Sequence, residues 1–283
     1  MENQGTDDPM KGRAAMNESK LANRSPWIFF LLVYALTLPL WLLSTRVHFE
    51  GLPDNLPVTD IGATFVPLLA ALILVYREKK GKGVRELLGK TFDYRKIKER
   101  AWYGPILFLM PLVYLLTYWV MRWLGFAVPA EWTIPLMAPV IFIFFFIGAA
   151  GEELGYTGYA IDPLQQRWGA LGACLIMGPL WAFWHFPSMI ELGQAPALMA
   201  WGFFFTVAVR ILNVWIYNNT GKSVFAVILF HAVGNTARSL FPGGRPHFEL
   251  GNAAVGYSII ILTAIVVIFL WGPKTLARFR YAA

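Results

Sequence analysis

Five polar residues stand inside otherwise apolar stretches of this 283-residue chain. They are Glu152, Glu153, His185, His231 and Asn235. An ionisable side chain at membrane depth is costly, so it usually faces the bundle interior or a water-filled cavity and has a function. Two acids, two imidazoles and one amide can together activate a water molecule and stabilise an oxyanion.

The two acids are adjacent in the run IFIFFFIGAAGEELGYTGYAI. Adjacent helical residues point about 100° apart, so only one of the two acids can face a given cavity. The other caps the helix, pairs with another side chain or supports the site. The carboxyl group that faces the cavity is a candidate general base or acid. A helix that ends in water at this point, with both acids solvated, explains the same pattern.

The histidines lie on two further apolar stretches. His185 comes shortly before Pro187, and because a proline disfavours helix in the preceding residue, His185 is predicted near a helix end. There it either joins a site or sits in an aromatic belt at the interface. His231 and Asn235 share one helix face through their spacing of four. They either act together or hydrogen-bond neighbouring helices, as polar residues in bundles do.

The elements that carry these residues are predicted to be membrane-spanning helices. Hydrophobic residues make up 57% of the chain and charged residues 14%, against about 25% charged residues in soluble domains. A spanning helix needs roughly 20 apolar residues. The sequence therefore predicts an all-α polytopic membrane helix bundle with about eight transmembrane helices. Their expected ranges are 26–45, 58–76, 102–124, 133–152, 168–186, 195–217, 222–240 and 251–272.

Lys and Arg are concentrated at one end of these helices. With the N-terminus inside, 19 of the 24 Lys and Arg residues lie in inner segments, as the positive-inside rule predicts. The net charge of +7 therefore reflects topology, and no nucleic-acid partner is expected. We expect a multi-pass protein of the cell membrane with both termini in the cytoplasm. Residues 1–25 are predicted to form a mobile cytoplasmic tail and residues 26–283 a single transmembrane bundle.

At the polar residues the chain resembles the CPBP family, which joins type II CAAX prenyl endopeptidases with bacteriocin-processing and immunity-type membrane proteins. The family motifs EExxxR, FxxxH and HxxxN align in order with residues 152–157, 181–185 and 231–235. The first matches in its two acids, the second in its histidine and the third fully, and the resemblance covers about residues 80–240. It implies an intramembrane glutamic endopeptidase that uses no metal or other cofactor. Its implied substrates are membrane-associated proteins or peptides, prenylated CAAX-type substrates among them.

The resemblance also implies roles for the five polar residues. Glu152 and His185 would activate water, His231 and Asn235 would hold the developing oxyanion, and Glu153 would support the site.

Two positions depart from the family motifs. Trp181 replaces a phenylalanine and keeps an aromatic filler, whereas Thr157 replaces an arginine and removes a cation beside the acids. Arg167 and Arg210 are candidates to replace this charge. Arg210 lies within a predicted span, where its guanidinium group either pairs with a glutamate or reaches the membrane interface.

Other classes of protein remain open on the sequence alone. A non-catalytic membrane scaffold or a bacteriocin-immunity-type protein fits the missing motif arginine. A metal-dependent protease is a further alternative, because a glutamate and two histidines can supply the three ligands of a catalytic zinc ion. A transporter is the remaining alternative, since buried acids can relay protons. The single cysteine, Cys174, excludes an intramolecular disulfide.

Overall fold

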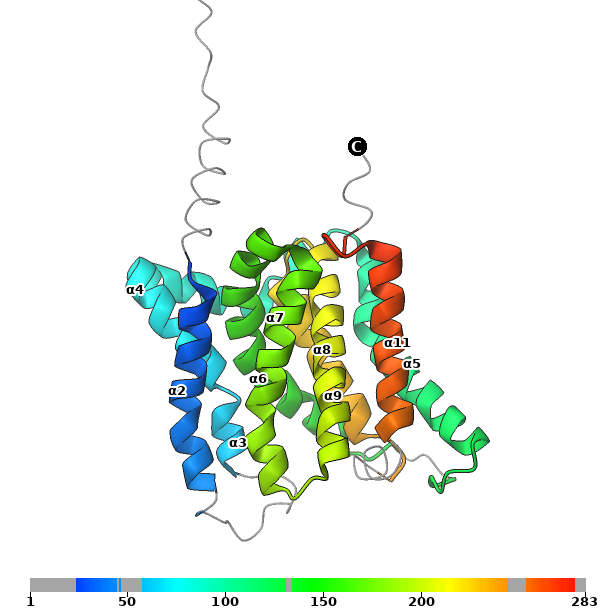
Figure 1. The fold of residues 1–283 in the computed structure, drawn as a ribbon. Coiled ribbons are helices and arrows are strands. Elements are labelled where there is room, and N and C mark those ends of the chain that lie inside the picture. Colours follow the sequence, from blue (N-terminus) through cyan, green and yellow to red (C-terminus); the bar gives the residue numbers. More distant parts are fainter. Residues whose placement is uncertain (1–23, 45, 47–57, 131–133, 244–252, 278–283) are drawn as a thin grey trace, which may run out of the picture.

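The computed structural model describes residues 24–44, 46, 58–130, 134–243 and 253–277, and contains helices and no strand within them. The predicted tail at 1–25 lies almost wholly outside these described residues. Figure 1 shows the helices side by side in one bundle. The main helices are α2 (Pro26–Ser44), α3 (Val58–Ala63), α4 (Val66–Leu88), α5 (Tyr103–Trp123), α6 (Ala138–Gly155), α7 (Ile161–Glu191), α8 (Pro196–Asn219), α9 (Val224–Ser239) and α11 (Ala253–Trp271).

The composition of these helices suits a lipid environment. Six stretches of the described chain are long and apolar enough to cross a membrane, and the longest of them combines α6 and α7. Large apolar side chains such as Leu31, Trp123 and Phe269 are exposed on the outside of the bundle. Helices satisfy their own backbone hydrogen bonds, which hydrocarbon requires. These observations confirm the predicted all-α polytopic membrane bundle.

The predicted end of the fourth span near Glu152 is wrong. α6 continues through a π-helical turn at Tyr156–Ala160 into the first part of α7. The chain reverses only at Gly169, whose φ of 69° lies in the left-handed region that favours glycine. Glu152 and His185 lie at similar distances along the chain before and after this reversal. The two residues therefore reach similar depths in the bundle.

The second half of α7 contains another departure from expectation. The helix continues through Pro187 and ends at Glu191, so His185 does not lie at a helix end. The helices that carry the candidate residues are linked by packing, with α8 between α7 and α9. α6 packs against α9 and α4, and α7 packs against α8.

Two glycines flank the glutamates and allow α6 to approach the start of α4 closely. A Cβ atom added at Gly151 would lie 2.8 Å from the carbonyl oxygen of Thr64, and one added at Gly155 would overlap the carbonyl of Pro67. Small residues spaced by four are a common means of close helix contact in membranes. This contact sets the position of the two glutamates relative to α4.

The Gly155→Ala variant is therefore expected to lose stability. Its methyl group meets backbone atoms that cannot move without shifting α4, and such overpacking typically costs about 1–3 kcal/mol. Thermal unfolding of the purified protein in detergent measures this loss as a lower Tm. The control is Gly104→Ala on α5, where an added Cβ meets nothing within 4 Å. Equal Tm values for the two variants would contradict the close α6–α4 contact.

Candidate active site

A cavity of about 240 Å³ lies between α6, α7 and α9. Four of the five residues predicted from the sequence line it. They are Glu152, His185, His231 and Asn235. Glu153 does not line the cavity and lies behind its wall. The expectation that only one of the adjacent acids faces a given cavity is therefore confirmed.

Glu152 is held at the cavity wall by a tryptophan. Only 8% of Glu152 is exposed, and its Oε2 accepts a hydrogen bond of 2.8 Å from the indole Nε1 of Trp181. A buried carboxyl oxygen needs such a donor, because an unsatisfied one is costly. Sequence reasoning treated Trp181 only as an aromatic filler. The phenylalanine of the family motif has no N–H group and cannot make this bond.

His185 contacts the same tryptophan. Its Nδ1 lies 2.7 Å from the backbone carbonyl oxygen of Trp181, and because a carbonyl only accepts, Nδ1 carries the proton. The basic nitrogen of the neutral ring is then Nε2. The ring packs edge-on against Trp181 and Trp184, with centroids 5.5 and 4.9 Å away. These contacts fix the orientation of the imidazole.

His231 is held by Glu153. The Nδ1 atom of His231 lies 3.1 Å from Oε1 of Glu153, and the two side chains are 7% and 0% exposed. Asn235 follows one turn later on α9 and also faces the cavity. The ring of Trp181 lies edge-on to His231, with centroids 5.6 Å apart. Trp181 therefore contacts three of the four candidate residues that line the cavity.

Glu153 is the centre of a fully buried polar cluster. Its carboxylate accepts hydrogen bonds from Arg210 at 2.9 and 3.2 Å, from Asn213 at 3.1 Å, and from the hydroxyl of Thr157. Both Glu153 and Arg210 are 0% exposed. Arg210 therefore forms a pair within the bundle and does not extend to the interface.

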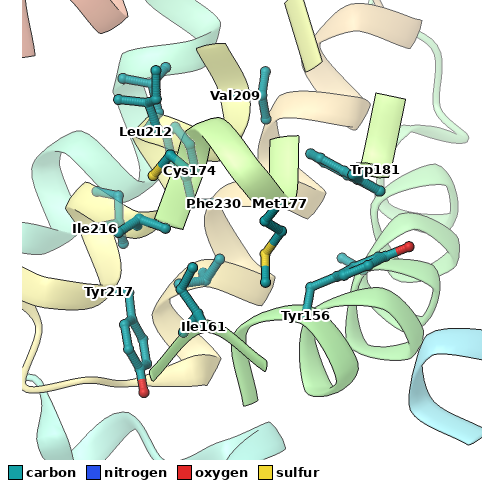
Figure 2. Close-up of a cluster of buried hydrophobic side chains, with 14 of the residues drawn as sticks. Tyr156, Ile161, Cys174, Met177, Trp181, Val209, Leu212, Ile216, Tyr217 and Phe230 are labelled. Carbon is teal, nitrogen blue, oxygen red and sulfur yellow. The ribbon is translucent and has the colours of Figure 1, made fainter. Parts of the chain in front are cut away.

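The guanidinium of Arg210 also lies over aromatic rings. It is 4.2 Å from the ring centroid of Trp181 and 5.3 Å from that of Tyr156. Figure 2 shows Tyr156 and Trp181 at one side of a buried apolar cluster that includes Met177 and Ile161. The other candidate cation, Arg167, bonds the backbone carbonyl of Arg24 at the surface. Of these two cations, Arg210 is the one beside the acids.

The described residues contain no group of three or more His, Cys, Asp or Glu side chains placed to hold a metal ion. The cavity is lined by acidic, imidazole and amide side chains. It holds a buried carboxyl group, two imidazoles in fixed orientations and an amide. These groups can accept a proton from water and donate hydrogen bonds to a developing negative charge.

Comparisons with known proteins agree with the motifs. Residues 133–237 match a protein family described as type II CAAX prenyl endopeptidase Rce1-like. The chain is also 25% identical over 232 residues to CAAX prenyl protease 2 of Methanococcus maripaludis, an alignment that covers 76% of this chain and 84% of that protein. The matched region contains all five candidate residues. The chain is therefore similar to type II CAAX prenyl endopeptidases, in the region that carries the candidate residues.

Proposed function

We propose that this protein is an intramembrane endopeptidase in which Glu152 and His185 activate a water molecule for attack on a peptide bond. One observation carries the proposal. Three helices of an apolar bundle bring four polar residues to one cavity, namely Glu152, His185, His231 and Asn235. The similarity to type II CAAX prenyl endopeptidases supports peptidase activity in general. The roles of the individual residues rest on the geometry.

Glu152 is the proposed general base. It accepts the proton of the attacking water, and the basic Nε2 of His185 orients that water or shares its proton. The Trp181 N–H group holds Glu152 in place through the bond at 2.8 Å. A positioned base of this kind contributes about 10²–10⁴-fold to a rate.

His231 and Asn235 are the proposed donors to the oxyanion. Nδ1 of His231 lies 3.1 Å from Oε1 of Glu153, and this contact holds the imidazole in place. When both ring nitrogens carry protons, Nε2 can donate a hydrogen bond while Nδ1 binds Glu153. The amide of Asn235 supplies a second donor one helical turn away. Donors already in place before the reaction stabilise the tetrahedral intermediate without reorganisation.

Peptide cleavage by the purified protein tests this function. The substrates are internally quenched peptides that end in a CAAX sequence, with and without a prenyl group, because the relative from Methanococcus maripaludis carries the name CAAX prenyl protease 2. We expect cleavage of at least one of them in nanodiscs, with activity retained after exhaustive chelation of metal ions. Loss of activity on chelation would favour a metal-dependent protease. A folded protein that cleaves no peptide would favour a non-catalytic scaffold.

Trp181→Phe tests the indole bond to Glu152. This variant restores the aromatic residue of the family motif but leaves Oε2 of Glu152 without its donor. We expect kcat to fall by about tenfold, which corresponds to about 1.4 kcal/mol. The control is Trp119→Phe on α5, where the tryptophan is 59% exposed and lies away from the cavity, so kcat should not change. If both variants keep the kcat of the wild type, the Trp181 bond does not position the base.

We also propose that both termini lie in the cytoplasm. The loop between α4 and α5 carries a dense group of Lys and Arg residues, and loops of this kind remain inside. Single cysteines introduced at Lys98 and Ala130 report opposite ends of the bundle in a Cys174→Ala background, because Cys174 is the only cysteine. We expect a membrane-impermeant maleimide to label the Ala130 position in intact cells and the Lys98 position only after permeabilisation. The reverse pattern would overturn the orientation.

The same experiment shows which side of the membrane the polar end of the cavity faces. Beyond the candidate site, the cavity is lined by polar residues that include Asp60, Ser188 and Gln194. These residues lie at the start of α3, near the end of α7 and in the loop before α8, which is the end of the bundle away from the Lys and Arg cluster. The end that is labelled in intact cells is therefore also the end at which these polar residues line the cavity.

A further inference from the structure

The buried cluster around Glu153 contains a cation that the family motif would place elsewhere. The motif has an arginine at position 157, four residues after Glu153, whereas this chain has Thr157. On a helix, that spacing directs a side chain towards the residue one turn earlier. In this structure the short Thr157 side chain bonds Glu153 through its hydroxyl, and Nη1 of Arg210 lies 3.3 Å from the same hydroxyl. The guanidinium of Arg210 thus lies beside position 157.

We propose that Arg210 on α8 replaces the motif arginine and positions Glu153, and through Glu153 the imidazole of His231. This inference rests on the proposed function, because it assigns a purpose to the orientation of His231. Arg210 touches neither substrate nor reacting atoms, so it is a positioning residue.

The hydrogen bonds around Glu153 show how the guanidinium acts on His231. Arg210 binds both carboxylate oxygens, Oε2 at 2.9 Å and Oε1 at 3.2 Å. Oε1 is the same atom that lies 3.1 Å from Nδ1 of His231. A fork of two N–H groups fixes the plane of a carboxylate as well as its charge. The orientation of the Glu153 carboxylate in turn determines which nitrogen of His231 faces it.

A second contact links Arg210 to the other side of the site. Its guanidinium lies 4.2 Å from the ring centroid of Trp181, and Trp181 donates the hydrogen bond to Glu152. Arg210 therefore packs against the supports of both glutamates. Within the described residues its own Nε has no hydrogen-bond partner. The contacts with Glu153 and Trp181 thus set the position of the Arg210 side chain, and one of its N–H donors has no acceptor among the described residues.

Removing Arg210 alone does not separate positioning from folding, because breaking a buried ion pair leaves an uncompensated charge and destabilises the protein. The test is therefore an exchange of the two positions. The double variant Thr157→Arg, Arg210→Met returns the cation to position 157, in the π-helical turn after α6, and leaves an apolar side chain on α8. The single variants Thr157→Arg and Arg210→Met, and Arg167→Met at the surface, are measured beside it.

Three readouts are compared for each variant: Tm, the kcat and KM of peptide cleavage, and the ¹⁵N signals of the His231 ring. We expect Arg210→Met to lower Tm and to lower kcat by at least about 100-fold with little change in KM, as loss of a group that orients a catalytic imidazole does. The double variant should recover Tm, the His231 signals and a kcat within about tenfold of the wild type. Arg167→Met should match the wild type.

The outcomes separate this inference from the proposed function. If the wild type cleaves peptide and the double variant recovers Tm but not kcat, Arg210 is structural only and the positioning role is overturned. A folded Arg210→Met variant with the kcat and His231 signals of the wild type would overturn it as well. If the wild type cleaves nothing, the proposed function fails, and Tm and the His231 signals of the double variant still decide whether the cation can be exchanged.

Discussion

The Glu152→Gln variant is expected to lose peptide cleavage by about 10²–10⁴-fold, the contribution of a positioned general base. The amide keeps the shape of the side chain and an oxygen that can accept the Trp181 bond, so the fold should be preserved. The amide cannot take a proton from water at neutral pH. The loss should therefore appear in kcat of the purified variant in nanodiscs, with the same Tm as the wild type.

Glu99→Gln is the control for this variant. Glu99 is exposed in the loop before α5, and the same chemical change there should leave kcat unaltered. Turnover at the rate of the wild type in a folded Glu152→Gln protein would reject Glu152 as the base. If instead turnover falls but a cellular phenotype of the gene persists, the physiological role of the protein is non-catalytic.

Asn235→Ala is expected to lower kcat by about 10²–10³-fold, the usual loss when one donor to an oxyanion is removed. The donor acts on charge that develops only in the transition state, so KM should change little. Because Asn235 is at the cavity wall and outside the buried cluster around Glu153, the variant should keep its Tm. Steady-state cleavage of the quenched peptide measures both constants.

The exposed amide Gln166 on α7 supplies the control for Asn235, and Gln166→Ala should behave as the wild type. A higher KM with an unchanged kcat for Asn235→Ala would show that Asn235 binds substrate and does not stabilise the transition state. The oxyanion assignment would then fail, whereas the assignment of Glu152 would stand.

The helical architecture could be predicted because hydrocarbon demands long apolar helices, and these are visible as charge-poor runs. Boundaries were less predictable where the helix continues through polar sequence. α4 runs to Leu88, past the expected end at residue 76, with a kink at Lys80. α6 continues through Glu152 and Glu153 because the side chains that hydrogen-bond these two acids are buried beside them. The local sequence does not reveal hydrogen-bond partners that lie on another helix.

The candidate site could be predicted in part. The acids, the histidines and Asn235 stood out because polar side chains are rare inside apolar spans. Which cation accompanies Glu153 could not be settled, since Arg210 is 57 residues away in the chain and only the packing of α8 brings it to Glu153. The role of Trp181 was missed for a related reason. Its indole N–H group matters only because Glu152 lies within hydrogen-bond distance.

The most direct test of the central claim is hydrolysis in water enriched in ¹⁸O, followed by mass spectrometry of the products. If the four residues around the cavity direct a water molecule at the peptide bond, the wild-type protein should yield a product whose new carboxyl group carries one solvent ¹⁸O atom. The Glu152→Gln protein should form this product at least about 10²-fold more slowly. Cleavage by both proteins at the same rate, or by neither, would contradict the account.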